Sequence, residues 1–210
     1  MRTAPRRIRT KLESGGKAYG IAVQLPSPEI VEAVGYVGYD FAWIDTEHGA
    51  FDLSDMREMI RAADAAGIDS LVRVAGHDPT AIQHVLDLGA TGIIAPDIRD
   101  AAQAREIVSA AHFAPSGSRG ACPAGRAVGH LTQDWPTDYG RMDADVLVFG
   151  IVEQRPGSSS ARHRQGQRRA PRASTSYSQR SAAPSGARFQ RSSSKPPLRT
   201  GPRFPPVTGT

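Results

Sequence analysis

The sequence predicts an α/β fold of the (β/α)8 TIM-barrel type, to which this chain contributes about the first five βα units. Two observations carry the prediction: short apolar runs alternate with helical patterns at regular intervals, and several of the runs end in charged side chains. Such alternation is typical of repeated βα units around a parallel sheet. A whole barrel needs about 250 residues, whereas the apolar patterning of this 210-residue chain stops near residue 155.

Five apolar runs are predicted to be strands. They are Tyr19–Leu25, Phe41–Asp45, Ser70–Val74, Gly92–Pro96 and Val146–Val152. Each run is short and lies between turn-forming or charged residues, and continuous apolar runs of this length are typical of strands that are covered on both faces. The order of strands and helices therefore favours a parallel sheet.

Helices are predicted after each of the first four strands, from their start and stop signals. The expected first residues are Ser27, Asp52, Asp78 and Asp100, which are residue types that cap helix N-termini. Proline follows at positions 28 and 79, and glycine is expected to end three of the helices near 35, 67 and 89. The fourth helix should end near Ala111, and the segment from Pro115 to Asp143 is loop-like, with a short helix expected near Asp138.

The composition divides the chain into two parts. Residues 1–155 are expected to form the partial barrel domain, with 15 basic and 21 acidic side chains. Residues 156–210 contain 11 Lys or Arg and no Asp or Glu. Few apolar residues occur in this second part and they follow no period, so it is expected to be a disordered Arg/Ser/Pro-rich tail.

Cysteine content and hydropathy narrow the class of protein. The single cysteine, Cys122, excludes an intrachain disulfide and fits a reducing compartment. No run approaches the roughly 18 apolar residues that a membrane span requires, and the basic segment from Arg2 to Lys17 is not followed by an apolar signal core. A cytoplasmic protein without membrane partners is therefore expected.

The strand ends carry the residues that point to chemistry. Glu47 and His48 follow the second strand, Arg73 lies inside the third, Asp97 follows the fourth and Glu153 follows the fifth. Because the carboxyl ends of parallel strands share one edge, these groups are expected to surround one small ligand. Alternatives remain open: Glu47 and His48 suit a solvated turn, and Arg73 an edge position with its charge in water.

Several ordered motifs resemble one enzyme family. They are GYDFAWIDTEHG at 38–49, LVRV at 71–74, LDLGATGIIAP at 86–96, AR at 104–105, PSGSRG at 115–120 and IVE at 151–153. Over about residues 5 to 156 the chain resembles the HpcH/HpaI aldolase/citrate lyase family. It is most similar to the metal-dependent branch that acts on 4-hydroxy-2-oxo diacids and 2-dehydro-3-deoxyglucarate.

The resemblance implies a class II aldol reaction, in which pyruvate and an aldehyde are joined to, or released from, a 4-hydroxy-2-oxo acid with the help of a divalent ion. His48 matches the catalytic base, which acts directly or through water, and Asp87 matches the carboxylate that pairs with it. Arg73 matches the arginine that binds substrate and steadies the enolate oxygen, and Glu153 matches a metal ligand. The implied ion is Mg or Mn, with Co possible. Taken alone, Asp87 also suits a residue near a helix end, and Glu153 a surface acid.

The resemblance breaks after Glu153. The family continues with further strands and with a Gly-Pro-x-Asp-Leu-Ser motif, whose aspartate is the second metal ligand, but no acidic residue follows Glu153 here. We expect a shift of reading frame near Pro156, because the composition changes abruptly there and because codon degeneracy allows segment 172–178 to encode an apolar, strand-like run in a frame displaced by one nucleotide. The family commonly forms hexamers, and the helices that build such contacts fall partly in this region.

Three functions follow from the sequence. The first is an aldolase with impaired activity, whose partners are small molecules such as pyruvate and an aldehyde. The second is a nonfunctional, frameshifted fragment with exposed strand edges. The third, favoured least, is a polyanion-binding protein, because the basic tail would attract phosphates but carries no recognised nucleic-acid module.

Overall fold

The computed structural model describes residues 6–153, all of which lie within the first of two contact units, residues 1–166. The elements, in chain order, are α1 (Arg7–Glu13), β1 (Gly20–Val23), α2 (Pro28–Tyr36), β2 (Phe41–Asp45), α3 (Leu53–Ala65), β3 (Asp69–Arg73), α4 (Pro79–Asp87), β4 (Gly92–Ala95), α5 (Ala101–Ala111), the 3-10 turn η1 (Arg126–Val128), α6 (Trp135–Asp145) and β5 (Leu147–Gly150). The expected tail and the expected frame change lie outside the described residues.

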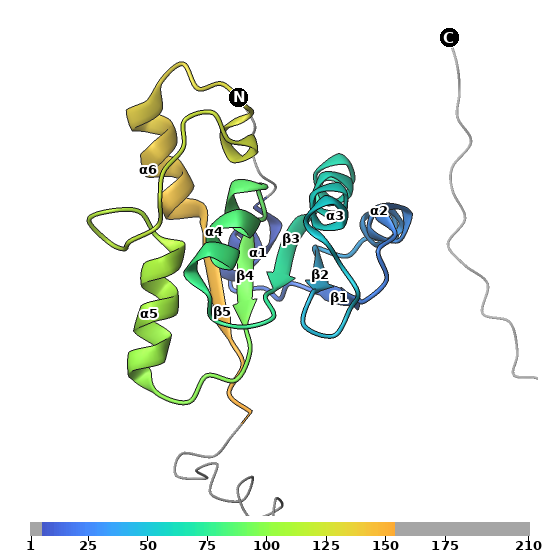
Figure 1. Ribbon diagram of the computed structural model, residues 1–210. Coiled ribbons are helices and arrows are strands. Elements are labelled where there is room, and N and C mark those ends of the chain that lie inside the picture. The colour runs from blue at the N-terminus through green and yellow to red at the C-terminus, as the bar shows by residue number, and fades with distance from the viewer. Residues whose placement is uncertain (1–5, 154–210) are drawn as a thin grey trace, which may run out of the picture. The chain divides into compact units, whose positions relative to one another are not determined.

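The five predicted strands are confirmed and form one parallel sheet in the order β1-β2-β3-β4-β5. Figure 1 shows this sheet with α2, α3, α4 and α5 arranged along it. Sequential order with parallel pairing is what repeated βα units produce. β2 has the predicted bounds, β3 begins and ends one residue earlier than predicted, and β1, β4 and β5 are shorter because apolar residues continue into the loops that leave the sheet.

The helix starts follow the predicted capping chemistry with one exception. Asp52 and Asp55 form a reciprocal capping box, and Asp78 and Asp100 each accept two backbone N–H groups at the starts of α4 and α5. Ser27 precedes α2, but its hydroxyl bonds to Glu29 at 2.9 Å instead of capping the backbone. The proline at position 28 sets the first turn of α2 in its place.

Two helices differ from the sequence prediction. α6 covers 11 residues instead of a short turn, because Met142, Trp135 and Tyr139 pack with Phe113 in a cluster of their own. α1 is not predicted, since its basic sequence has little apolar periodicity. It is held by tertiary contacts: Ile8 is buried against β3 and β4, and its backbone N–H donates to Asp69 at 2.7 Å.

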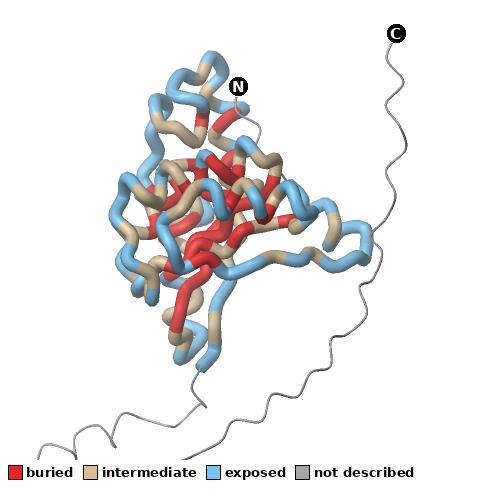
Figure 2. Tube along the Cα trace, turned by 90° about the vertical axis from the view of Figure 1, so that its right-hand side faces the viewer, coloured by how far each residue is buried: buried red, intermediate tan, exposed pale blue. Residues whose placement is uncertain are grey.

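Side chains alternate between the two faces of the sheet. The helix-covered face carries the larger core cluster, including Ile44, Val72 and Ile93, and Figure 2 shows the buried residues concentrated along the strands. The opposite face carries Phe41, Trp43, Leu71 and Ile94, which pack with Ile8. This second face corresponds to the interior of a barrel. Polar side chains on it at the carboxyl ends of the strands therefore lie where a barrel enzyme binds its ligand.

Candidate active site

The site is built on a register pair of β2 and β3. Asp45 and Arg73 are the last residues of their strands and stand opposite each other in the ladder. Asp45 follows Phe41 and Trp43 at the strand period of two, so all three point to the inner face. The guanidinium of Arg73 donates from Nε to Asp45 Oδ1 at 2.8 Å and from Nη2 to Oδ2 at 2.5 Å. This fork fixes the guanidinium at the carboxyl ends of the strands.

Asp45 organises the turn that follows it. Its carboxylate also accepts the Gln24 side-chain amide at 2.7 Å and the backbone N–H groups of Glu47 and His48, each at 3.3 Å. The Arg73 guanidinium, helped by these donors and opposed by burial, holds the pKa of the Asp45 carboxyl well below its usual range. The group is therefore ionised at neutral pH, and it positions Arg73 and the Glu47-His48 turn.

Arg73 is a partly buried cation with several partners. Its side chain is 12% exposed, its Nη1 lies 3.0 Å from Glu47 Oε2, and its guanidinium carbon lies 5.3 Å from the centre of the Trp43 ring. The hydrogen bond with Asp45 raises the pKa of Arg73 against the effect of burial, and the charges of Asp45, Glu47 and Glu153 act in the same direction. Arg73 is therefore a paired arginine, and not the solvated edge arginine of the alternative interpretation.

His48 and Glu153 complete the group, which we call the rim: Asp45, Glu47, His48, Arg73 and Glu153. The His48 side chain is 60% exposed, with Nε2 3.7 Å from Glu47 Oε2. Glu153 is exposed and follows β5, near enough for its charge to act on Arg73. Asp97 follows β4 but pairs with Arg99. The strand ends thus gather one guanidinium, one imidazole and three carboxylates.

Asp87 lies at the other end of the sheet. It is the last residue of α4, which runs back toward the start of β4, whereas His48 follows the end of β2. Its carboxylate accepts Arg119 Nη2 at 2.7 Å. The expected pairing of Asp87 with His48 therefore has no basis within one chain, and the carboxylate beside His48 is Glu47.

Three supporting residues were not selected from the sequence as site residues. Asp45, Gln24 and Trp43 hold Arg73 or its partner. The period of two along β2 places Trp43 and Asp45 on the same face, which was an available signal. Gln24 had none, because its contact with Asp45 depends on how the chain leaves β1.

The rim offers an incomplete set of ligands for a divalent ion. The carboxylates of Glu47 and Glu153 offer the oxygen donors that Mg and Mn prefer, but Glu47 is engaged with Arg73. Between residues 6 and 153 no group of three or more His, Cys, Asp or Glu side chains is arranged to hold a metal. The rim offers a fixed guanidinium, which can bind an organic anion, and an exposed imidazole, which can accept or donate a proton. No helix in the same range is long and apolar enough to cross a membrane.

Comparison of the sequence with curated proteins identifies relatives of this chain. The chain is 33% identical over 154 residues to a 4-hydroxy-2-oxovalerate aldolase of Novosphingobium aromaticivorans, covering 73% of this chain and 58% of that protein. It is 38% identical over 101 residues to a 2-dehydro-3,6-dideoxy-6-sulfogluconate aldolase of Pseudomonas putida, covering 48% and 40% of the two proteins. The chain thus spans about half the length of these curated relatives.

Solved structures agree with the sequence relatives. An HpcH/HpaI aldolase of Desulfitobacterium hafniense aligns with a TM-score of 0.66 at 26% identity, covering 70% of this chain and 56% of that one. Macrophomate synthase aligns with a TM-score of 0.60 at 28% identity, covering 71% and 54%. The model of the family described as HpcH/HpaI aldolase/citrate lyase matches residues 19–162, a range that contains all five strands and the whole rim. The chain belongs to the HpcH/HpaI aldolase/citrate lyase family.

Proposed function

We propose that the rim is the catalytic centre of a divalent-metal-dependent aldolase, which cleaves 4-hydroxy-2-oxo acids to pyruvate and an aldehyde or runs the reverse reaction. The observation that carries the proposal is the Arg73 guanidinium, which two hydrogen bonds to Asp45 fix at the strand ends, where the Glu153 charge also acts on it. Relatives named as pyruvate, hydroxypyruvate and 4-hydroxy-2-oxovalerate aldolases support this substrate class.

Arg73 is proposed to bind the 2-oxo acid and to steady negative charge on its enolate oxygen. A prepositioned cation needs little reorganisation when charge develops, and such electrostatic stabilisation is often the largest catalytic contribution. Asp45 and Trp43 hold the guanidinium from two sides. The Glu47 carboxylate, whose Oε2 is buried and makes no well-aligned hydrogen bond in the described chain, is the contact that an anionic substrate would replace.

His48 is proposed to move the proton. Its imidazole is exposed at the rim and is of the type that exchanges protons near neutral pH. In the cleavage direction it takes the proton of the 4-hydroxyl group, and the C3–C4 bond then breaks to leave the enolate and the aldehyde. Protonation of the enolate at C3 gives pyruvate. Glu47 Oε2 lies 3.7 Å from Nε2 and is the carboxylate beside the imidazole.

Glu153 is proposed to supply a carboxylate to the divalent ion, Mg, Mn or Co, which would polarise the 2-oxo acid when bound. The rest of the ligand set is not supplied by residues 6–153, and no Asp or Glu occurs after Glu153 in the sequence. A hard cation held by so few carboxylates binds weakly. We therefore expect low activity from this chain and higher activity from a chain translated in a restored frame.

The test measures pyruvate release from a 4-hydroxy-2-oxo acid with Mg or Mn, in this chain and in the restored-frame chain. Arg73→Lys keeps the charge but loses the fork to Asp45, so pyruvate release should fall about a hundredfold or more. Arg57→Lys is the matched control, because Arg57 is 51% exposed on α3 and pairs only locally with Glu58. An inactive restored-frame chain would refute the proposal, and so would equal rates in Arg73→Lys and Arg57→Lys.

A further inference from the structure

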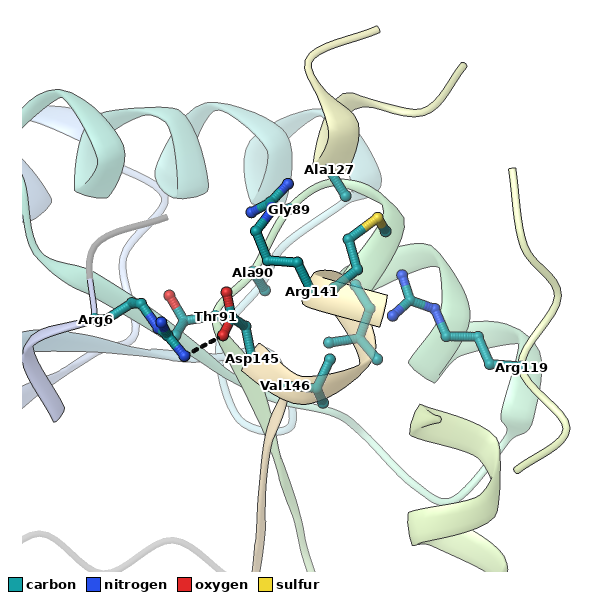
Figure 3. Close-up of a pocket in the computed structure, with 11 residues that line it drawn as sticks. Arg6, Gly89, Ala90, Thr91, Arg119, Ala127, Arg141, Asp145 and Val146 are labelled. Carbon is teal, nitrogen blue, oxygen red and sulfur yellow. Dashed lines mark ion pairs between the residues drawn. The ribbon is translucent and has the colours of Figure 1, made fainter. Parts of the chain in front are cut away.

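The loops at the two ends of the parallel strands are held by different kinds of contact. At the amino ends, three arginines line the pocket in Figure 3, and each pairs with a carboxylate: Arg6 with Asp145, Arg119 with Asp87 and Arg141 with Asp138. At the carboxyl ends, the imidazole of His77 joins the loop after β3 to the connection between β4 and α5. The proposed catalysis does not use this histidine.

His77 has a hydrogen-bond partner at each ring nitrogen. Its Nε2 lies 2.5 Å from the carbonyl oxygen of Pro96, and its Nδ1 lies 2.8 Å from the side-chain amide nitrogen of Gln103. Pro96 directly follows β4, and Gln103 lies in the first turn of α5, so both partners belong to the same connection. We call this pair of hydrogen bonds the imidazole bridge.

The two partners determine which ring nitrogen of His77 carries the proton. The side-chain oxygen of Gln103 accepts the backbone N–H of Arg99 at 2.9 Å, which turns the amide nitrogen of Gln103 toward His77. An amide nitrogen can only donate, so Nδ1 of His77 is the acceptor and carries no proton. The carbonyl oxygen of Pro96 can only accept, so the proton lies on Nε2. The imidazole bridge therefore requires a neutral ring in one tautomer.

The turn that the imidazole bridge holds, residues 96–98, has an unfavourable conformation. Asp97, at its centre, has a φ angle of 46°, in the left-handed region that residues other than glycine seldom adopt. Its Oδ2 accepts two N–H groups of Arg99, but its buried Oδ1 has no hydrogen-bond partner among residues 6–153. Both features cost free energy, and such conformations persist only where the surrounding structure fixes them. We call residues 96–98 the Asp97 turn.

The Asp97 turn is also bonded to the segment that carries Glu153. The backbone N–H of Ile98 donates to the carbonyl oxygen of Ile151 at 2.8 Å, and the N–H of Ile151 donates back to the last residue of β4 at 2.9 Å. Glu153 follows two residues after Ile151. A continuous set of hydrogen bonds therefore leads from His77 through the Asp97 turn to the backbone beside Glu153.

We propose that His77 is a positioning residue of the rim: its neutral imidazole holds the Asp97 turn, and the turn holds the backbone that presents Glu153. The inference rests on the proposed function, in which Glu153 supplies a carboxylate to the divalent ion. The positioning is a property of the chain without metal, so it can be tested separately. Without the imidazole bridge, the bonds between the Asp97 turn and Ile151 should open more often.

Nitrogen NMR of the unmodified full chain tests the tautomer and needs no variant. Long-range proton–nitrogen spectra distinguish a protonated from an unprotonated ring nitrogen, and the His77 ring is assigned through its bonds to the backbone. In buffer just above neutral pH we expect a single tautomer, with a proton on Nε2 and none on Nδ1. A ring protonated on Nδ1, protonated on both nitrogens or exchanging between tautomers would overturn the inference.

Amide hydrogen exchange tests the positioning. His77→Ala should speed exchange at Ile98 and Ile151 about tenfold or more, because the turn that fixes their bonds loses its support. Leu147, whose N–H donates to Thr91 at the other end of the β4–β5 contact, should change about twofold or less. His84→Ala is the matched control, since His84 is exposed on α4, and it should leave all three amides unchanged.

Two exchange results would overturn the inference. Unchanged exchange at Ile98 and Ile151 in His77→Ala would show that the imidazole does not hold the turn, and an equal increase at Leu147 would assign His77 a general structural role. A titration of the unmodified chain with Mn, followed by electron paramagnetic resonance, reports separately on the proposed function. Absence of Mn binding, with the expected tautomer and exchange rates, would count against the metal role of Glu153 and leave the positioning by His77 intact.

Discussion

Arg73 and Asp45 show how the desolvation cost of a buried ion pair is offset at the end of two strands. Removing two charges from water is costly, and the cost is offset only when geometry is good and the remaining polar atoms find partners. Here the fork is complete, the Asp45 carboxylate has further donors, and Trp43 covers the guanidinium. The pair thus holds a largely buried cation beside His48 and Glu153, which are themselves exposed.

Asp45→Asn tests the pair directly. The amide removes the charge and turns one acceptor into a donor facing Arg73 or Gln24, so a largely buried cation is left without its main partner. We expect the free energy of unfolding at pH 7 to fall by about 2 to 4 kcal/mol, as measured by urea titration. Glu58→Gln, which alters an exposed pair on α3, is the control and should change stability by about 0.5 kcal/mol or less. Equal stabilities for the two variants would contradict this account.

The same pair has a defined pH dependence. Because the pKa of Asp45 is lower in the folded state than in the unfolded chain, its contribution is present above the unfolded pKa and is lost as pH falls below it. Asp45→Asn should therefore differ most from the wild type at neutral pH and least in acid.

At the scale of elements, the strands and most helices could be predicted because their signals are local. Apolar runs of strand length, Asp at helix starts and glycines after helix ends are readable in a few residues each. Gly67 and Gly89 adopt positive φ angles of 66° and 92°, as helix ends require. The features that could not be predicted depend on contacts between residues distant in the sequence. α1 is held because Ile8 packs against β3 and β4. Asp87 contacts Arg119 because α4 runs back toward the start of β4.

The β4–β5 contact depends on a glycine. A Cβ at Gly92 would lie 2.2 Å from the Leu147 carbonyl oxygen and 2.7 Å from its Cβ, in the register pair that joins the two strands. Gly92→Ala should push β5 away and lower the free energy of unfolding by about 2 kcal/mol or more. Gly140→Ala is the matched control, because nothing lies within 4 Å of its added Cβ inside α6. It should raise stability by about 0.5 to 1 kcal/mol, and a destabilised Gly140→Ala with an unaffected Gly92→Ala would reverse this interpretation.

In the described fold as a whole, the two ends of the parallel strands have different roles. The rim lies at the carboxyl ends of the strands. The amino ends are covered by α1 and by the buried polar contacts of Asp69 and Thr91. Division of this kind, with chemistry at one end and stability at the other, is general in βα barrels. It explains why the predicted site residues separate into a group that meets, at the rim, and Asp87, which does not.

Asp69 makes the stability of the fold at the amino ends of the strands depend on pH. Its side chain is fully buried and accepts the Ile8 N–H at 2.7 Å and the Thr91 hydroxyl at 3.3 Å. Burial raises the pKa of Asp69 to about 6, against the effect of these bonds and of the nearby Arg7, and the Asp40 charge acts in the same direction as burial. The folded state therefore holds this proton more tightly than the unfolded chain. The stability that Asp69 contributes is complete below its unfolded pKa and is lost as pH rises through about 6.

Asp69→Asn isolates this effect from the opposite trend of groups such as Asp45. Asparagine still accepts the Ile8 N–H through its carbonyl oxygen and can donate to Thr91, but it cannot ionise. The difference in unfolding free energy between variant and wild type should favour the variant increasingly from pH 4 to pH 7, by at most about 3 kcal/mol. Urea unfolding of both proteins at four pH values across this range measures the difference. A difference that stays constant with pH would mean that Asp69 titrates alike in the folded and unfolded chains.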